Sequence, residues 1–108
     1  MIDVIFYFGA EVILVRVHNG NLLFKSSTFG NVWGTIDGLK LSKAGVEKEF
    51  PDLVNDDQWN TKAIERFKAK IGTMKDEKEI ANYLIQDLKS HGYIPKFYQE
   101  AGFRKISL

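Results

Sequence analysis

Histidines are the side chains in this sequence best suited to acid–base chemistry, and there are only two of them, His18 and His91. The chain contains no cysteine, which removes thiolate nucleophiles, disulfides and cysteine metal sites together. A zinc site usually has four ligands, and the two histidines would need carboxylate ligands to complete it. The acids of this sequence show no spacing typical of a metal site. No serine lies in a G-x-S-x-G context. The sequence therefore assigns no catalytic residue and no metal ligand.

Each histidine also has a structural interpretation. His91 falls in the last turn of a predicted helix, where the helix dipole favours a cation. His18 is next to a predicted tight turn, so we expect its ring to be solvated. Neither has a neighbour in sequence that would orient it as a general base. A small enzyme or ligand-binding domain would need a pocket that brings one of them close to a carboxylate.

Carboxylates occur in close pairs at Asp56-Asp57, Glu47/Glu49 and Glu77/Glu79. Acids are expected at helix starts, which accounts for the first and last pairs. Residues two apart on a helix do not face each other, so the glutamate pairs are poor acid–base dyads. The glycines of residues 28–41 follow neither the G-x-G-x-x-G pattern nor a G-K-[S/T] ending. No cofactor is predicted.

Basic side chains gather in two parts of the sequence. From residue 58 to residue 75 there are five cations and one acid, a local charge of +4. A second group near the C-terminus mixes cations with aromatic residues, the types that contact phosphates and stack on bases. The nucleic-acid contacts that this pattern predicts are Lys62, Arg66, Lys68, Lys70, Lys75, Lys96, Arg104 and Lys105. The alternative is that the lysines cover the solvent face of an amphipathic helix and the aromatics are core.

The overall composition describes an ordinary globular chain. Its 108 residues fit one domain, 1–108, with 44% hydrophobic and 27% charged residues. The 15 basic and 14 acidic side chains leave a net charge of +1, so a general electrostatic footprint for nucleic acid is missing. No apolar run approaches the roughly 20 residues that span a bilayer. Asp3 and Glu11 interrupt the apolar N-terminal stretch, which argues against a signal peptide. We expect a soluble, cytoplasmic protein without a membrane partner.

The elements that must position these residues begin with a hairpin at residues 3–27. Asn19-Gly20 supplies the two positive φ angles of a type I′ turn. Counting outward from this turn pairs Val17 with Leu22, Val15 with Phe24 and Ile13 with Ser26. A second turn at Gly9-Ala10 pairs Phe6 with Ile13 and Val4 with Val15. The rival interpretation is one long strand with a bulge at Gly9.

This register sorts the hairpin residues onto two faces. One face is consistently apolar and includes Val4, Phe6 and Val15, so we expect it to face the core. The other face is mixed, and an uncovered apolar patch there would mark a partner surface or self-association. The predicted partner surface consists of Ile5, Tyr7, Val12, Leu14, Arg16, His18 and Lys25.

Three helices and two further strands follow the hairpin. Ser42 predicts an N-cap for a short helix over residues 43–50, which Pro51 ends. A longer helix is predicted to begin in residues 55–57 and to end at 72–73, and a third runs from Glu77 to about residue 91 after Asp76. A short strand is expected within 32–36, and strands over 96–99 and 103–108 surround a turn at 100–102. The order βββ-ααα-ββ predicts an α+β domain: an antiparallel sheet, built from an N-terminal three-stranded meander and a C-terminal hairpin, with about three helices on one face.

A non-enzymatic binding protein is the function that these patterns favour. It would act as an adaptor, inhibitor or accessory subunit through contact with another protein or with a second copy of itself as a homodimer. Nucleic-acid binding through residues 62–75 and the C-terminal segment is the first alternative, and a small enzyme or ligand-binding domain is the second.

Overall fold

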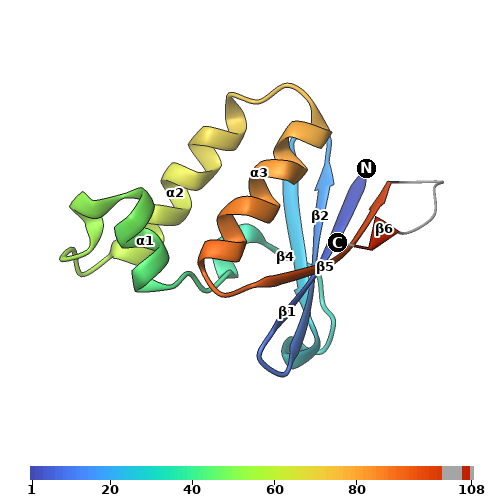
Figure 1. The fold of residues 1–108 in the computed structure, drawn as a ribbon, viewed down its shortest axis with the longest axis horizontal. Coiled ribbons are helices and arrows are strands. Elements are labelled where there is room, and N and C mark those ends of the chain that lie inside the picture. The colour runs from blue at the N-terminus through green and yellow to red at the C-terminus, as the bar shows by residue number, and fades with distance from the viewer. Residues whose placement is uncertain (101–105, 108) are drawn as a thin grey trace.

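The computed structural model of the protein describes residues 1–100 and 106–107, which form an antiparallel sheet with helices on one side (Figure 1). The six strands lie in the order β4-β3-β2-β1-β5-β6. Consecutive strands at the N-terminus are neighbours in the sheet, as expected for a meander. The strands are β1 (Ile2–Phe8), β2 (Glu11–His18), β3 (Asn21–Ser26), β4 (Gly34–Thr35), β5 (Ile94–Glu100) and β6 (Ile106–Ser107). The predicted α+β class and element order are confirmed.

Two tight turns set the register of the N-terminal strands. Asn19 and Gly20 have φ angles of 51° and 78°, the two positive values that a type I′ turn requires. Val17 then pairs with Leu22. At the first turn Gly9 has a φ of 58°, and Val4 pairs with Val15. Both predicted turns are confirmed, and the rival interpretation of a single bulged strand is wrong.

The helices form where apolar residues recur at helical spacing behind a capping side chain. Ser42 Oγ accepts a hydrogen bond from the Gly45 N–H at 3.0 Å, and Asp76 caps the third helix through the Lys78 N–H at 3.1 Å. The three helices are α1 (Lys43–Glu49), α2 (Trp59–Gly72) and α3 (Glu77–Ser90). Three short 3₁₀ turns are η1 (Ser27–Phe29), η2 (Ile36–Gly38) and η3 (Pro51–Leu53).

The start of α2 differs from the prediction. The helix begins at Trp59 rather than within residues 55–57. The Asp56 carboxylate accepts the Gln58 N–H at 2.8 Å, so this acid holds a turn ahead of the helix. Asp side chains can bond their own backbone in this way and so compete with helix formation.

The core lies between the sheet and the helices. Val4, Phe6, Val15 and Val17 on the sheet are fully buried, as predicted for this face. Helix α3 lies along the sheet, whereas α1 lies at the far end of the helical layer, against α2 (Figure 1). The helices contribute these buried core residues: Ile64, Phe67, Ile71, Ile80, Ala81, Leu84 and Leu88. A smaller cluster of Val46, Leu53 and Ala63 joins α1 to α2.

The last strands complete the edge of the sheet next to β1. β5 pairs with β1, and β6 pairs with β5 through Tyr98 and Ile106. The predicted C-terminal strands therefore both join the sheet. Residues 101–105, which include most of the predicted turn at 100–102 and the start of the last predicted strand, lie outside the described residues. Among the residues that the structure describes, no helix has the length and apolar character needed to cross a membrane.

Candidate functional site

The sheet surface opposite the helices, here called the open face, carries apolar side chains in two adjacent rows. Strand register aligns Val12 with Tyr7 and Tyr7 with Ile94, which makes one row across β2, β1 and β5. The next row consists of Leu14, Ile5 and Phe97, with Lys25 at its β3 end. Because side chains alternate along a strand, both rows point away from the buried face.

The first row is the more exposed of the two. Tyr7 is 41% exposed, Val12 45% and Ile94 54%, although all three are large apolar or aromatic side chains. Side chains of the second row are partly buried among their neighbours. The two rows therefore form one contiguous apolar patch instead of scattered exposed residues. Patches of this kind mark interaction surfaces.

Cations border this patch and lie over aromatic rings. The Lys96 ammonium lies 5.5 Å from the centre of the Tyr7 ring. Both the Arg16 guanidinium and the Lys25 ammonium lie 4.6 Å from the Trp33 ring. Such contacts attract the cations to the faces of the aromatic rings. The border of the patch is thus positively charged and partly ordered.

One ion pair, between Asp3 and Arg16, lies on the open face next to the row of Leu14 and Ile5. Arg16 donates from Nε to Asp3 Oδ1 at 2.8 Å and from Nη2 to Oδ2 at 3.0 Å. This bidentate hydrogen bonding with Asp3 raises the pKa of Arg16, against a smaller opposing effect of burial. Because these two charges cancel, Lys25 and Lys96 supply the net charge of the open face within the part of the chain that the structure describes.

The structure places all the predicted partner-surface residues on this face. Ile5, Tyr7, Val12, Leu14, Arg16 and Lys25 lie together, and His18 is exposed at the far end of β2. The prediction missed Trp33, Ile94 and Phe97, which complete the patch. The aromatic character of residues 97–98 was visible in the sequence, but the pairing of β5 with β1 was not.

The predicted nucleic-acid contacts are distributed differently. Lys62 pairs with Asp56 at 2.5 Å, Arg66 with Asp52 at 2.6 Å and Lys68 with Asp37 at 2.9 Å. Hydrogen bonding to these cations lowers the pKa of all three aspartates.

The other predicted contacts are spread over several places. Lys70 lies 4.8 Å from the Tyr83 ring, Lys75 is exposed, and Lys96 belongs to the open face. Arg104 and Lys105 lie outside the described residues. Acids from other segments therefore offset much of the local positive charge of α2, and its role in nucleic-acid binding stays a prediction.

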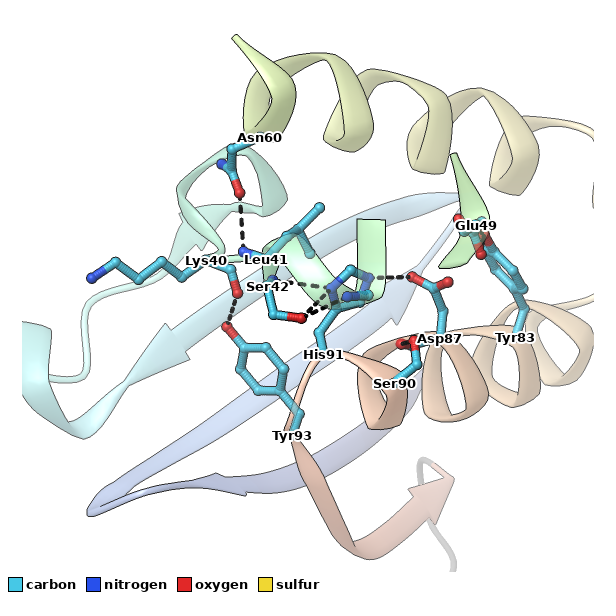
Figure 2. A network of polar contacts seen from close by, with 11 residues as sticks. Lys40, Leu41, Ser42, Glu49, Asn60, Tyr83, Asp87, Ser90, His91 and Tyr93 are labelled. Carbon is cyan, nitrogen blue, oxygen red and sulfur yellow. Dashed lines mark hydrogen bonds and ion pairs between the residues drawn. The ribbon is translucent and has the colours of Figure 1, made fainter. Parts of the chain in front are cut away.

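His91 lies inside a buried polar network between α1 and α3. Its side chain is 3% exposed, its Nε2 lies 3.6 Å from Asp87 Oδ2, and its Nδ1 lies 3.4 Å from Ser42 Oγ (Figure 2). These are the residue types of a serine hydrolase triad. Sequence reasoning missed the network, because Ser42 and His91 are 49 residues apart.

The hydrogen bonds within this network argue against nucleophilic catalysis. The Ser42 backbone N–H donates to His91 Nδ1 at 3.0 Å, so the lone pair that would take a proton from the hydroxyl is already in use. Ser42 Oγ itself accepts the Gly45 N–H as a helix cap. This arrangement fixes the ring proton on Nε2, toward Asp87. The network joins elements of the fold, and no reacting group is poised in it.

The segment of residues 40–42 is held by three side chains in succession (Figure 2). The Tyr93 hydroxyl donates to the Lys40 carbonyl at 2.5 Å, and Asn60 accepts the Leu41 N–H at 3.0 Å. Burial raises the pKa of Tyr93 to about 12. With His91 holding Ser42, these bonds fix the entry to α1.

A hollow of about 440 Å³ lies at the end of the β2–β3 hairpin, separate from this network. Its lining includes Leu22, Ile36 and Ile71, and the Lys68–Asp37 ion pair lies at the same place. Within residues 1–100 and 106–107, no group of three His, Asp or Glu side chains is arranged to hold a metal ion.

Comparison with protein-family models, with curated proteins and with solved structures finds no match to this chain.

Proposed function

We propose that this protein is a non-enzymatic binding module whose open face receives a protein partner. The observation that carries the proposal is the continuous row of Val12, Tyr7 and Ile94, exposed on three adjacent strands. Burying large apolar side chains on association contributes about 25 cal/mol of favourable transfer free energy for each Å² of apolar surface removed from water. A second row beneath this one extends the area available to a partner.

The chemistry of the partner follows from the border of the patch. Lys25 and Lys96 lie at its border, whereas Arg16 is neutralised by Asp3. A complementary surface is apolar at its centre and carries carboxylates at its edge. Two copies of this chain meeting through their open faces would bring lysine borders together, which favours a different protein as the partner.

A protein explains the patch better than a nucleic acid does. Its centre is largely aliphatic, through Ile5, Leu14 and Val12, whereas bases stack on free aromatic faces. The Trp33 ring already has two cations over it.

Site-specific photo-crosslinking in cells of the source organism tests the proposal. A photoreactive residue at Val12 samples the open face, and one at Ala69, exposed on α2, is the matched control. We expect one discrete protein adduct from position 12 and none of that mass from position 69.

Three outcomes would overturn this assignment. Equal adducts from both positions would show that the contact is unspecific. An adduct twice the mass of the chain would identify a second copy as the partner. A nuclease-sensitive adduct at position 12 would assign the face to nucleic acid instead.

A further inference from the structure

Glu49, the last residue of α1, lies against α3, where it meets the side chains of Tyr83 and Asp87. The Tyr83 hydroxyl lies 3.3 Å from Glu49 Oε1 and 3.4 Å from Oε2 (Figure 2). Glu49, Tyr83 and Asp87 all line one open hollow between the two helices. The Asp87 carboxyl is the second acid of the pair, and its residue is only 7% exposed.

Two carboxylates that line the same partly buried hollow are stable together when one of them keeps a proton. Burial raises the pKa of Glu49 to about 7, and hydrogen bonding to Asp87 and its charge add to the effect. Burial alone would also raise the pKa of Asp87, but hydrogen bonds from His91 and Glu49 outweigh it and lower that pKa. The proton therefore belongs on Glu49, which donates it to the Asp87 carboxylate.

The other charged and titratable groups around the pair come from all three helices. Lys70 of α2 favours the ionised form of both acids. On α3, His91 directs Nε2 toward Asp87, and the proximity of Asp87 and Glu49 adds to burial in raising the pKa of Tyr83. Lys48 lines the hollow from α1 itself. These groups moderate the repulsion between the two carboxylates but do not replace the shared proton.

Helix α1 is the shortest of the three α-helices and relies on contacts with the rest of the fold. It has seven residues, and isolated helices shorter than about 12–15 residues are marginal in water. Its apolar attachment is the small cluster of Val46, Leu53 and Ala63. His91 holds its N-terminal end through Ser42, and Glu49 holds its C-terminal end.

We propose that Glu49 and Asp87 form a one-proton latch that holds α1 against α3 and opens when the proton is lost. The device is independent of the open face, which lies on the other side of the sheet. Its working range is the neutral pH region, around the raised pKa of Glu49.

Hydrogen exchange of the α1 amides between pH 6 and pH 8, corrected for the intrinsic pH dependence of exchange, tests the latch. We expect the protection of residues 46–50 against exchange to fall about tenfold from pH 6 to pH 8 in the wild-type protein. This fall is smaller than the change in protection that the whole pKa shift of Glu49 would give, because the site is partly exposed. Glu49→Gln keeps a donor toward Asp87 without titrating, so its protection should stay constant. Glu47→Gln, an exposed acid on the same helix, should behave like the wild type.

Asp87→Asn supplies a second variant, because it removes the charge of Asp87 but leaves the burial of Glu49. The fall in protection should therefore be clearly smaller in Asp87→Asn than in the wild-type protein. Wild-type protection that does not change with pH would overturn the proposal. A tenfold fall that persists in Glu49→Gln or in Asp87→Asn would overturn it as well.

Discussion

Gly45 of α1 provides the sharpest test of how the His91 network is packed. A Cβ at this position would lie 2.3 Å from His91 Nδ1 and 2.6 Å from its Cε1. The ring cannot easily move away, because the Ser42 N–H and Asp87 hold it from two sides. Gly45→Ala therefore forces either the ring or the helix out of place.

The magnitude follows from two opposing effects. Overpacking a buried site costs about 1–3 kcal/mol, and a contact this short at a fixed ring belongs at the upper end. Replacing glycine by alanine inside a helix contributes up to about 1 kcal/mol in the opposite direction. We expect Gly45→Ala to lower the free energy of unfolding by about 2 kcal/mol. The midpoint of thermal unfolding should fall by about 8 °C for a domain of this size.

Gly72, at the end of α2, is the matched control. Its Cβ would meet nothing within 4 Å, so Gly72→Ala should be neutral or stabilising by up to about 1 kcal/mol. Thermal and urea unfolding of both variants supply the comparison. In a His91→Ala background the cost of Gly45→Ala should largely disappear, since the clashing ring is gone. A Gly45→Ala protein as stable as the wild type would refute this description of the packing.

Further predictions concern the latch acid, the segment at residues 40–42, the core and the second hairpin turn. The folded protein holds the Glu49 proton up to about pH 7, whereas the unfolded chain releases it near the ordinary pKa of 4.5. The free energy of unfolding should therefore fall by about 1–2 kcal/mol as the pH rises from 4.5 to 7, after allowing for solvent screening. Urea titrations of Glu49→Gln should lack this fall. Tyr93→Phe leaves the Lys40 carbonyl without its donor and should cost about 1–3 kcal/mol in the same assay; an unchanged midpoint would contradict this role. Leu84→Ala, at a fully buried position, should cost about 2–5 kcal/mol, and a smaller loss would show that the core collapses around the gap. Gly20→Ala places a Cβ at a φ of 78° and should lower the thermal midpoint, whereas no change would show that the turn relaxes.

The parts of the fold that could be predicted depend on local chemistry. Asn19 and Gly20 define their turn through backbone conformations that few other residues adopt, and the strand register follows by counting. The Ser42 cap is likewise a local signal. These features placed the core face and the predicted partner surface of the hairpin on opposite sides of the sheet.

The parts that could not be predicted depend on contacts between distant segments. Ile94 and Phe97 join the open face only because β5 pairs with β1 after three intervening helices. The approach of Ser42 to His91 is also a tertiary contact. Gly45 carried one signal, since glycine inside a short helix often marks a close approach, but its partner could not be read from the sequence.

The charge of α2 shows the same limit. Counting along the sequence found one acid among five cations in residues 58–75. In the folded chain, Asp37 and Asp52 come from other segments to pair with Lys68 and Arg66. Local charge along a sequence therefore overstates the field of a surface that distant acids can reach.

The central claim is that the open face binds a protein partner. Crosslinking at Val12 identifies this partner, and the most direct test is to measure how tightly a variant substituted on the open face binds it. Ile94→Glu places a carboxylate in the exposed apolar row, at a side chain that is 54% exposed and so tolerant of substitution. Ala69→Glu adds the same charge on α2. We expect Ile94→Glu to weaken binding about 30-fold or more, as for a central interface residue, and Ala69→Glu to change it less than about twofold. Equal affinities for the two variants, with both proteins folded by circular dichroism, would contradict the assignment of this face.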